Sequence, residues 1–151
     1  MEIRIEEISP LAQEVRKLFK LLDEHNLSHC PQEICHLTQP DEMKKADSIL
    51  LGIFFSEKLV GMAGLKYFDD YAEVTRMFVL GNYRGKGLAS RLLAELESKA
   101  IERNLKILRL ETSEKFIHAV RLYKKLGFEK CKPFGEYISK AFNSYYQKEI
   151  K

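Results

Sequence analysis

The stretch VTRMFVLGNYRGKGLASRLLAELESKA, residues 74–100, decides the fold of this chain. It begins in an apolar strand predicted at 72–80 and passes through a loop at 81–86 that is rich in glycine and basic residues. A helix is predicted from 88 to about 103, because its leucines fall on one face at helical spacing. They are Leu88, Leu92, Leu93 and Leu96. A strand that runs through a short loop into a helix is typical of an α/β unit.

The loop before this helix is suited to binding an anion. The first N–H groups of a helix have no partner within the helix, and the macrodipole adds partial positive charge there. Gly85 and Gly87 leave the backbone uncovered, while Arg84 and Lys86 add fixed positive charge. These features predict a cradle for a diphosphate. The alternative is a helix cap in which the glycines serve only to reverse the chain.

Two common phosphate-binding loops are excluded by spacing. A P-loop requires G-x-x-x-x-G-K-[ST], but Gly81 lies one residue too close to Gly85-Lys86, and Gly87 stands where Ser or Thr is needed. A Rossmann turn requires Gly or Ala in the last place of G-x-G-x-x-G, and here that place is Ser90. The predicted cradle is therefore of another kind.

The rest of the chain adds strands and helices on both sides of this unit. Strands are predicted at 1–8, 48–56, 59–68, 72–80, 106–111, 129–132 and 144–149. Helices are predicted at 10–26, 40–46, 88–103 and 115–126. Ser9-Pro10 is expected to start the first helix, Glu57-Lys58 to form a hairpin turn, and residues 27–39 to form a loop. The order β-α-α-β-β-β-α-β-α-β-β favours a mixed α/β (α+β) fold with helices on both faces of the sheet.

Length and composition limit the class of protein. A chain of 151 residues fits a single domain, 1–151, with a core large enough to fold without disulfides or metal. The net charge of +3 is mild and spread along the chain, which disfavours nucleic-acid or membrane binding. The start, MEIRIEEISP, has no leader-like pattern, and three cysteines give no disulfide framework. A cytoplasmic location is the resulting expectation.

Two motifs make the chain resemble a known enzyme family. Arg84-x-x-Gly87-x-Ala89, between a strand and a helix, matches the R/Q-x-x-G-x-G/A signature of the GCN5-related N-acetyltransferases (GNAT). About 30 residues later, AVRLYKKLGF at 119–128 looks like the A-x-x-L-Y-x-x-x-G-F stretch of that family. The tail is similar to a bacterial branch whose substrates are mostly undefined. The resemblance implies a three-layer α/β/α fold around a central, mostly antiparallel, twisted sheet.

The resemblance also implies roles for residues around the loop. The backbone of Met77, Phe78 and Val79 would pair with the pantetheine arm of acetyl-CoA, and Tyr123 would lie near the thioester sulfur. The diphosphate would be held by Arg84, Gly85, Lys86, Gly87, Leu88 and Ala89. Many members carry Asn three residues before the position of Ala119, where this chain has Phe116, so one polar contact to the cofactor arm is in doubt.

Acetyl transfer to an amine needs a base and a proton donor for the departing thiolate. By the resemblance, Glu73 at the start of the central strand is the candidate base, because it stands where the histone-modifying branch of the family has its base. The pKa gap to an alkylammonium corresponds to on the order of 8 kcal/mol, so Glu73 needs a raised pKa, a water relay or an amine that is already neutral. Tyr123 is the candidate acid, and full transfer to a thiolate would be uphill by about 2 kcal/mol, so it either is tuned by its site or only hydrogen-bonds the thiolate. Arg76 is expected either to bind a substrate carboxylate or to pair with Glu73.

The leading functional hypothesis is acetyl transfer from acetyl-CoA to a primary amine of a small molecule, by direct attack in a ternary complex. The alternatives are acetylation of protein lysines or N-termini, and a non-catalytic module that binds acetyl-CoA. No metal is expected, because the cysteines and histidines of HCPQEICH at 29–36 have no standard zinc spacing and are better explained as a loop over the acceptor site. A homodimer is common among similar proteins.

Overall fold

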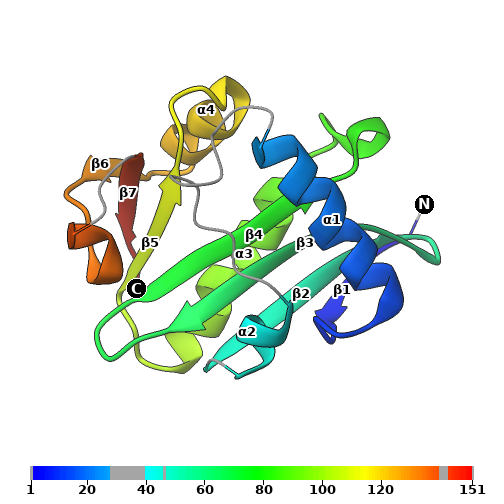
Figure 1. Cartoon of the computed structure of the whole chain (residues 1–151), viewed down its shortest axis with the longest axis horizontal. Helices are drawn as coiled ribbons and strands as arrows, with labels where there is room; N and C mark the ends of the chain where they lie inside the picture. Colours follow the sequence, from blue (N-terminus) through cyan, green and yellow to red (C-terminus); the bar gives the residue numbers. More distant parts are fainter. Residues whose placement is uncertain (1, 28–39, 46, 140–142, 151) are drawn as a thin grey trace.

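In the computed structural model, residues 2–27, 40–45, 47–139 and 143–150 are described, and they form one sheet with helices on both faces (Figure 1). The strands are β1 (Ile3–Glu7), β2 (Ser48–Phe55), β3 (Lys58–Tyr67), β4 (Ala72–Val79), β5 (Ile107–Thr112), β6 (Glu129–Cys131) and β7 (Ser144–Glu149). The helices are α1 (Gln13–Leu27), α2 (Pro40–Lys45), α3 (Leu88–Glu102) and α4 (Ile117–Lys125), with short 3-10 turns η1 (Gly81–Tyr83) and η2 (Gly135–Ser139). The predicted order of strands and helices is confirmed.

The sheet is mostly antiparallel, as predicted, with the strand order β1-β2-β3-β4-β5-β7-β6. The exception within the described residues is the parallel pair β4–β5, which is also short. It joins Ala72–Val74 to Leu108–Leu110 and then stops, although β4 continues to Val79 and β5 to Thr112. The two strands therefore separate at their carboxyl ends, and this gap organises the rest of the molecule.

A β-bulge bends β4 just beyond the point where it leaves β5. Gly64 of β3 faces Thr75 and Met62 faces Phe78, so Ala63 lies opposite both Arg76 and Met77. Arg76 has a left-handed backbone, with φ of 54°. A bulge of this kind increases local twist and redirects side chains. Here it lets β4 curve away from β5.

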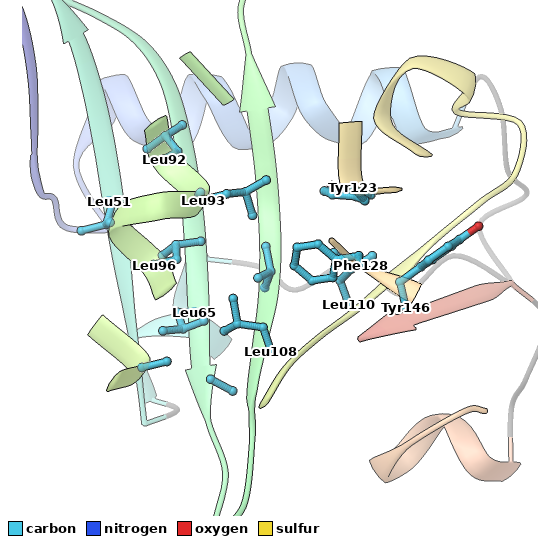
Figure 2. Packing of buried hydrophobic residues seen from close by; sticks show 14 of the residues in the cluster. Leu51, Leu65, Leu92, Leu93, Leu96, Leu108, Leu110, Tyr123, Phe128 and Tyr146 are labelled. Carbon is cyan, nitrogen blue, oxygen red and sulfur yellow. The ribbon is translucent and has the colours of Figure 1, made fainter. Parts of the chain in front are cut away.

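Two apolar clusters hold the helices against opposite faces of the sheet. The larger one contains the four predicted leucines of α3, all buried, packed on strand residues that include Leu65, Leu108 and Leu110 (Figure 2). The second places α1, through Val15, Phe19 and other residues, on the opposite face of β2–β4. Burial of whole leucine and phenylalanine side chains contributes about 1.5–3 kcal/mol each, so these faces fix the layers. The expected three-layer α/β/α arrangement around a mostly antiparallel sheet is confirmed.

Several predicted boundaries differ from the structure by one to three residues, and two of these differences have a clear physical cause. α1 begins at Gln13 and not at Pro10, because Ser9 closes a turn of its own: its Oγ accepts from the Leu11 N–H at 3.2 Å and its carbonyl from the Ala12 N–H at 3.2 Å. The β2–β3 turn is Ser56-Glu57, one residue before the predicted Glu57-Lys58. Ser56 takes the left-handed conformation, φ of 57°, that tight hairpins require. The loop predicted at 27–39 lies, except for its first residue, outside the described residues.

Candidate active site

A single cavity of about 920 Å³ occupies the gap between the separating ends of β4 and β5. Its walls come from β4, from the loop and first turn of α3, from the end of β5, and from α4, α1 and η2. Ligands of open α/β sheets bind at such a separation of parallel strands. The separation of β4 and β5 therefore creates the cavity, and the residues at the two ends of the cavity determine which ligands it can bind.

One end of the cavity is formed by the loop that precedes α3. Gly85 and Gly87 have left-handed backbones, with φ of 77° and 78°, and a β-carbon at either would meet nothing within 4 Å. The space above both glycines is open, as an anion cradle requires. The first hydrogen bond of α3 runs from the Arg91 N–H to the Gly87 carbonyl at 3.2 Å. The N–H groups before Arg91 are therefore left for a ligand.

Basic side chains border this end without filling it. Arg84 is held in place, since its Nε donates to the Val79 carbonyl at 2.9 Å and its guanidinium lies 5.5 Å from the Phe78 ring centroid. Gly85, Gly87, Leu88 and Ala89 line the cavity together with Arg84, whereas Lys86 is exposed beside it. Five of the six contiguous residues that the sequence singled out therefore lie on one wall of the cavity, and Lys86 lies outside it.

The middle of the cavity is bordered by β4 on one side and α4 on the other. Met77, Phe78 and Val79 line it, and beyond Val74 β4 has no strand partner on its β5 side within the described residues. Tyr123 faces them from α4, packed edge-on against Phe128 at 5.7 Å (Figure 2). Burial raises the pKa of Tyr123 to about 12, so its hydroxyl keeps its proton at neutral pH.

The other end of the cavity is acidic. Glu73 is only 6% exposed, and its carboxylate accepts a hydrogen bond of 2.7 Å from the hydroxyl of Tyr137 in η2. Burial raises the pKa of Glu73, while the Tyr137 hydrogen bond and the Lys66 charge act in the opposite direction. On the next strand, Glu111 accepts a 3.3 Å hydrogen bond from Tyr145.

Glu111 is the most perturbed carboxyl group of this end. Burial, the largest cause, together with the nearby charges of Glu73 and Glu136, raises its pKa to about 7, against the lowering effect of hydrogen bonds from Asn143 and Tyr145. A carboxyl group with such a pKa changes its charge near neutrality. Titratable groups perturbed in this way are concentrated at functional sites.

Arg76 lies in the cavity wall, but its charge is used within the protein. Its guanidinium is buried, pairs with the Asp23 carboxylate of α1 and lies 4.7 Å from the ring centroid of Phe19. One of the two roles expected from the sequence was an ion pair between Arg76 and Glu73. In the structure Arg76 pairs with Asp23, and Glu73 accepts a hydrogen bond from Tyr137. The bulge turns Arg76 toward α1, which explains the difference.

An aromatic pair lines the cavity at Phe116, where the resemblance leads to the expectation of Asn. Phe116, the residue that caps the start of α4, stacks on His25 of α1 with centroids 5.5 Å apart and an interplanar angle of 21°. His25 also lies 6.4 Å from the Phe78 ring of β4. All three residues line the cavity. Phe116 therefore forms an apolar link between the last turn of α1 and the start of α4, at a position where a polar contact was expected.

The cavity also contains residues that the sequence analysis did not single out, among them His25, Glu111, Tyr137 and Asn143. Glu111 was recognised only as the end of a strand. The signal that could have found it is the alternation of β5, which puts Arg109 and Glu111 on one face, combined with the placement of β5 beside β4. Tyr137 and Asn143 have no such signal, since they belong to the irregular segment before β7.

The described residues contain neither a cluster of metal ligands nor a membrane-spanning helix. Among the described residues, no three His, Cys, Asp or Glu side chains are grouped to hold a metal ion. The segment HCPQEICH lies outside those residues. No helix in the described ranges combines the length and apolar character that crossing a bilayer requires.

Known proteins share both the sequence pattern and the fold. The model of the acetyltransferase (GNAT) family matches residues 12–128. An IAA acetyltransferase of Azospirillum brasilense is 32% identical over 144 residues, covering 94% of each chain. A spermine/spermidine N(1)-acetyltransferase of Bacillus subtilis is 31% identical over 104 residues, covering 63% of this chain and 62% of the other.

The fold also agrees with that of a solved structure of lower sequence identity. PaiA N-acetyltransferase from Thermoplasma acidophilum, solved in complex with coenzyme A, superposes with a TM-score of 0.76. The match covers 99% of this chain and 100% of the other at 18% identity, which establishes the likeness of fold.

Proposed function

We propose that this chain, which belongs to the acetyltransferase (GNAT) family, transfers an acetyl group from acetyl-CoA to a primary amine of a small molecule. The observation that carries the proposal is the division of one cavity into a glycine-rich basic end and a buried acidic end. The first suits a diphosphate and the second an ammonium group. The middle, where β4 and Tyr123 face each other, is where donor and acceptor would meet.

The open loop fits the cofactor. Arg84 to Ala89 would hold the diphosphate with backbone N–H groups of α3 and the fixed charge of Arg84, because the space above Gly85 and Gly87 is unobstructed. The free edge of β4 at Met77, Phe78 and Val79 would hold the pantetheine arm. Bound acetyl-CoA supplies an activated acyl thioester, and Leu88 and Ala89 would form the wall beside its phosphates.

Glu73 would remove the proton that makes the amine unreactive. Its raised pKa brings it closer to the basicity of an amine, which narrows a gap that is otherwise on the order of 8 kcal/mol. Tyr137 holds the carboxylate in one orientation through its 2.7 Å hydrogen bond. We assign Glu73 as the base and Tyr137 as the residue that positions it.

Tyr123 would stabilise the departing thiolate by donating a hydrogen bond. With a pKa of about 12 against about 8.5 for a thiol, complete proton transfer would cost about 5 kcal/mol. Burial thus favours the second of the two roles predicted for Tyr123, in which the hydroxyl keeps its proton. A neutral donor in a dry site still lowers the energy of a developing negative charge.

The acceptor is proposed to be a small cationic amine. Glu73 is buried inside the cavity, within reach of a slender molecule. The similarity to a spermine/spermidine acetyltransferase supports the same class. Arg76 would contribute indirectly, since its pair with Asp23 holds α1 over the acceptor end. The protein's location in the cytoplasm and its assembly as a homodimer stay predictions.

The test is acetyl-CoA-dependent thiol release with a panel of primary amines, read together with the mass of the product. We expect thiol release only when an amine is present and an N-acetylated amine in equal amount. Thiol release without an acetylated amine, or modification of added protein in preference to every small amine, would contradict the proposal.

A further inference from the structure

We propose that the acceptor is a diamine or a similar dication, with Glu111 binding the second positive group while Glu73 serves the reacting one. This inference rests on the proposed function and names the substrate class of the same site. The acidic end of the cavity contains two carboxyl groups, although the acetylation of a single amine requires only one base.

The two carboxyl groups come from neighbouring strands and reach one cavity. β4 and β5 pair in parallel with Glu73 opposite Arg109, which puts Glu111 two residues further along toward the separation of the strands. Glu73 and Glu111 both line the cavity, with Tyr137 and Asn143 beside them. Each carboxylate already accepts from a tyrosine, Tyr137 and Tyr145 respectively, so both are fixed in position.

Among the described residues, the charges that act on Glu111 have the same sign as its own carboxylate. The charged groups that act on it are Glu73 and Glu136, both acidic, and its hydrogen-bond donors Asn143 and Tyr145 are neutral. Around Glu73 the acting charges are Lys66 and Glu136. Nearby Arg109 has its guanidinium 4.6 Å from the ring centroid of Tyr71, and its Nε donates to Gln147 at 3.3 Å.

Two partly desolvated carboxylates in one cavity repel each other, and burial makes the repulsion more costly. A ligand with one ammonium group would offset the charge of one of them. A ligand with two would offset both, and its binding would favour ionised Glu111. The arrangement therefore discriminates between a diamine and a monoamine of the same length.

The comparison of putrescine with butylamine tests this directly, because the two have the same carbon chain and differ in the second amine. We expect the wild-type KM for putrescine to be at least about tenfold lower, as for a hydrogen bond to a charged group. In Glu111→Gln the KM for putrescine should rise about tenfold, while that for butylamine should change less than about twofold. Glu95→Gln, on the exposed face of α3, is the matched control and should change neither.

Coenzyme A affinity, measured by calorimetry, shows whether the Glu111→Gln protein has kept its fold, and Glu111→Asp provides a second variant that keeps the charge. Glu111→Asp should retain part of the preference for putrescine. Equal KM values for both amines in the wild type, or an equal loss for both in Glu111→Gln, would overturn the inference and leave the proposed function intact. Failure to acetylate any amine would overturn both.

Discussion

The two ends of the cavity differ in how they are built. The basic end consists of consecutive residues, Arg84 to Ala89, and presents mainly backbone N–H groups. The acidic end combines β4, β5 and η2, and Glu73 lies 64 residues from its partner Tyr137. A site that binds a diphosphate through backbone N–H groups can be built from one short segment of consecutive residues. A site that binds an acceptor through side chains depends on the tertiary structure, which brings together residues distant in the sequence.

The largest effect should come from removing the base at the acidic end. Glu73→Gln is nearly isosteric, and we expect kcat to fall about 10²- to 10⁴-fold, the range of general base catalysis. Coenzyme A affinity should stay within about twofold, because the two ends act separately. Steady-state kinetics and calorimetry measure both. Glu57→Gln, in the exposed β2–β3 turn, is the control. If Glu73→Gln also lost affinity for coenzyme A, cofactor binding and amine activation would not be confined to separate ends of the cavity.

The next effect should come from the middle of the cavity, where both ends meet. Tyr123→Phe removes the hydrogen bond to the thiolate and should lower kcat about 10- to 100-fold with little change in KM for acetyl-CoA. Tyr146→Phe is a matched control, because Tyr146 is also buried but its hydroxyl is bonded to Glu114 outside the cavity. Unchanged kcat in Tyr123→Phe would favour a purely structural tyrosine.

A smaller effect is expected from the basic end. Arg84→Gln should weaken coenzyme A binding about five- to tenfold, because the backbone N–H groups remain and only one charge is lost. The difference in coenzyme A affinity between the wild type and Arg84→Gln should become smaller as the salt concentration is raised, because salt screens the charge of Arg84. Calorimetry at two ionic strengths measures it, with Lys99→Gln in the last turn of α3 as control. A fall in kcat without a change in affinity would assign Arg84 to the chemistry instead.

The smallest effect concerns stability at the acidic end. The folded-state pKa of Glu111 is about 7, above the unfolded value of about 4.3, so the folded protein binds more protons between these values. Stability should therefore fall as pH rises through this window. Glu111→Gln removes the cost of burying an ionised carboxylate. It should therefore stabilise the protein by about 1–2 kcal/mol near pH 8, after allowance for solvent screening, and by almost nothing near pH 4, where Glu111 is protonated in the folded protein. Urea unfolding at both pH values measures this, and a pH-independent difference would contradict it.

The sequence predicted the fold well because the signals that determine it are local. The α3 leucines, the alternating strands and the order of elements are all readable along the chain, and the deviations at Ser9 and Ser56 arise from turns that compete with the neighbouring helix or strand. Arg84 to Ala89 were proposed as the diphosphate loop for the same reason, because their pattern is local in the sequence.

The acceptor end was only half predicted. Glu73 was proposed as the base, but Glu111 and Tyr137 reach it through the β4–β5 pairing and η2, which no local pattern specifies. Arg76 shows the same limit. A bulge turns its side chain toward Asp23 of α1, whereas the sequence analysis had offered Glu73 as its partner.

The central claim is that the uncovered helix start at Gly87 holds a diphosphate. Asn and Asp both tolerate the left-handed backbone of Gly87, φ of 78°, and have nearly the same size, so Gly87→Asn and Gly87→Asp differ mainly in charge. We predict that calorimetry with coenzyme A will show binding at least about 100-fold weaker in Gly87→Asp than in the wild type, and less than about tenfold weaker in Gly87→Asn. Equal affinity in the Asn and Asp variants would contradict the account.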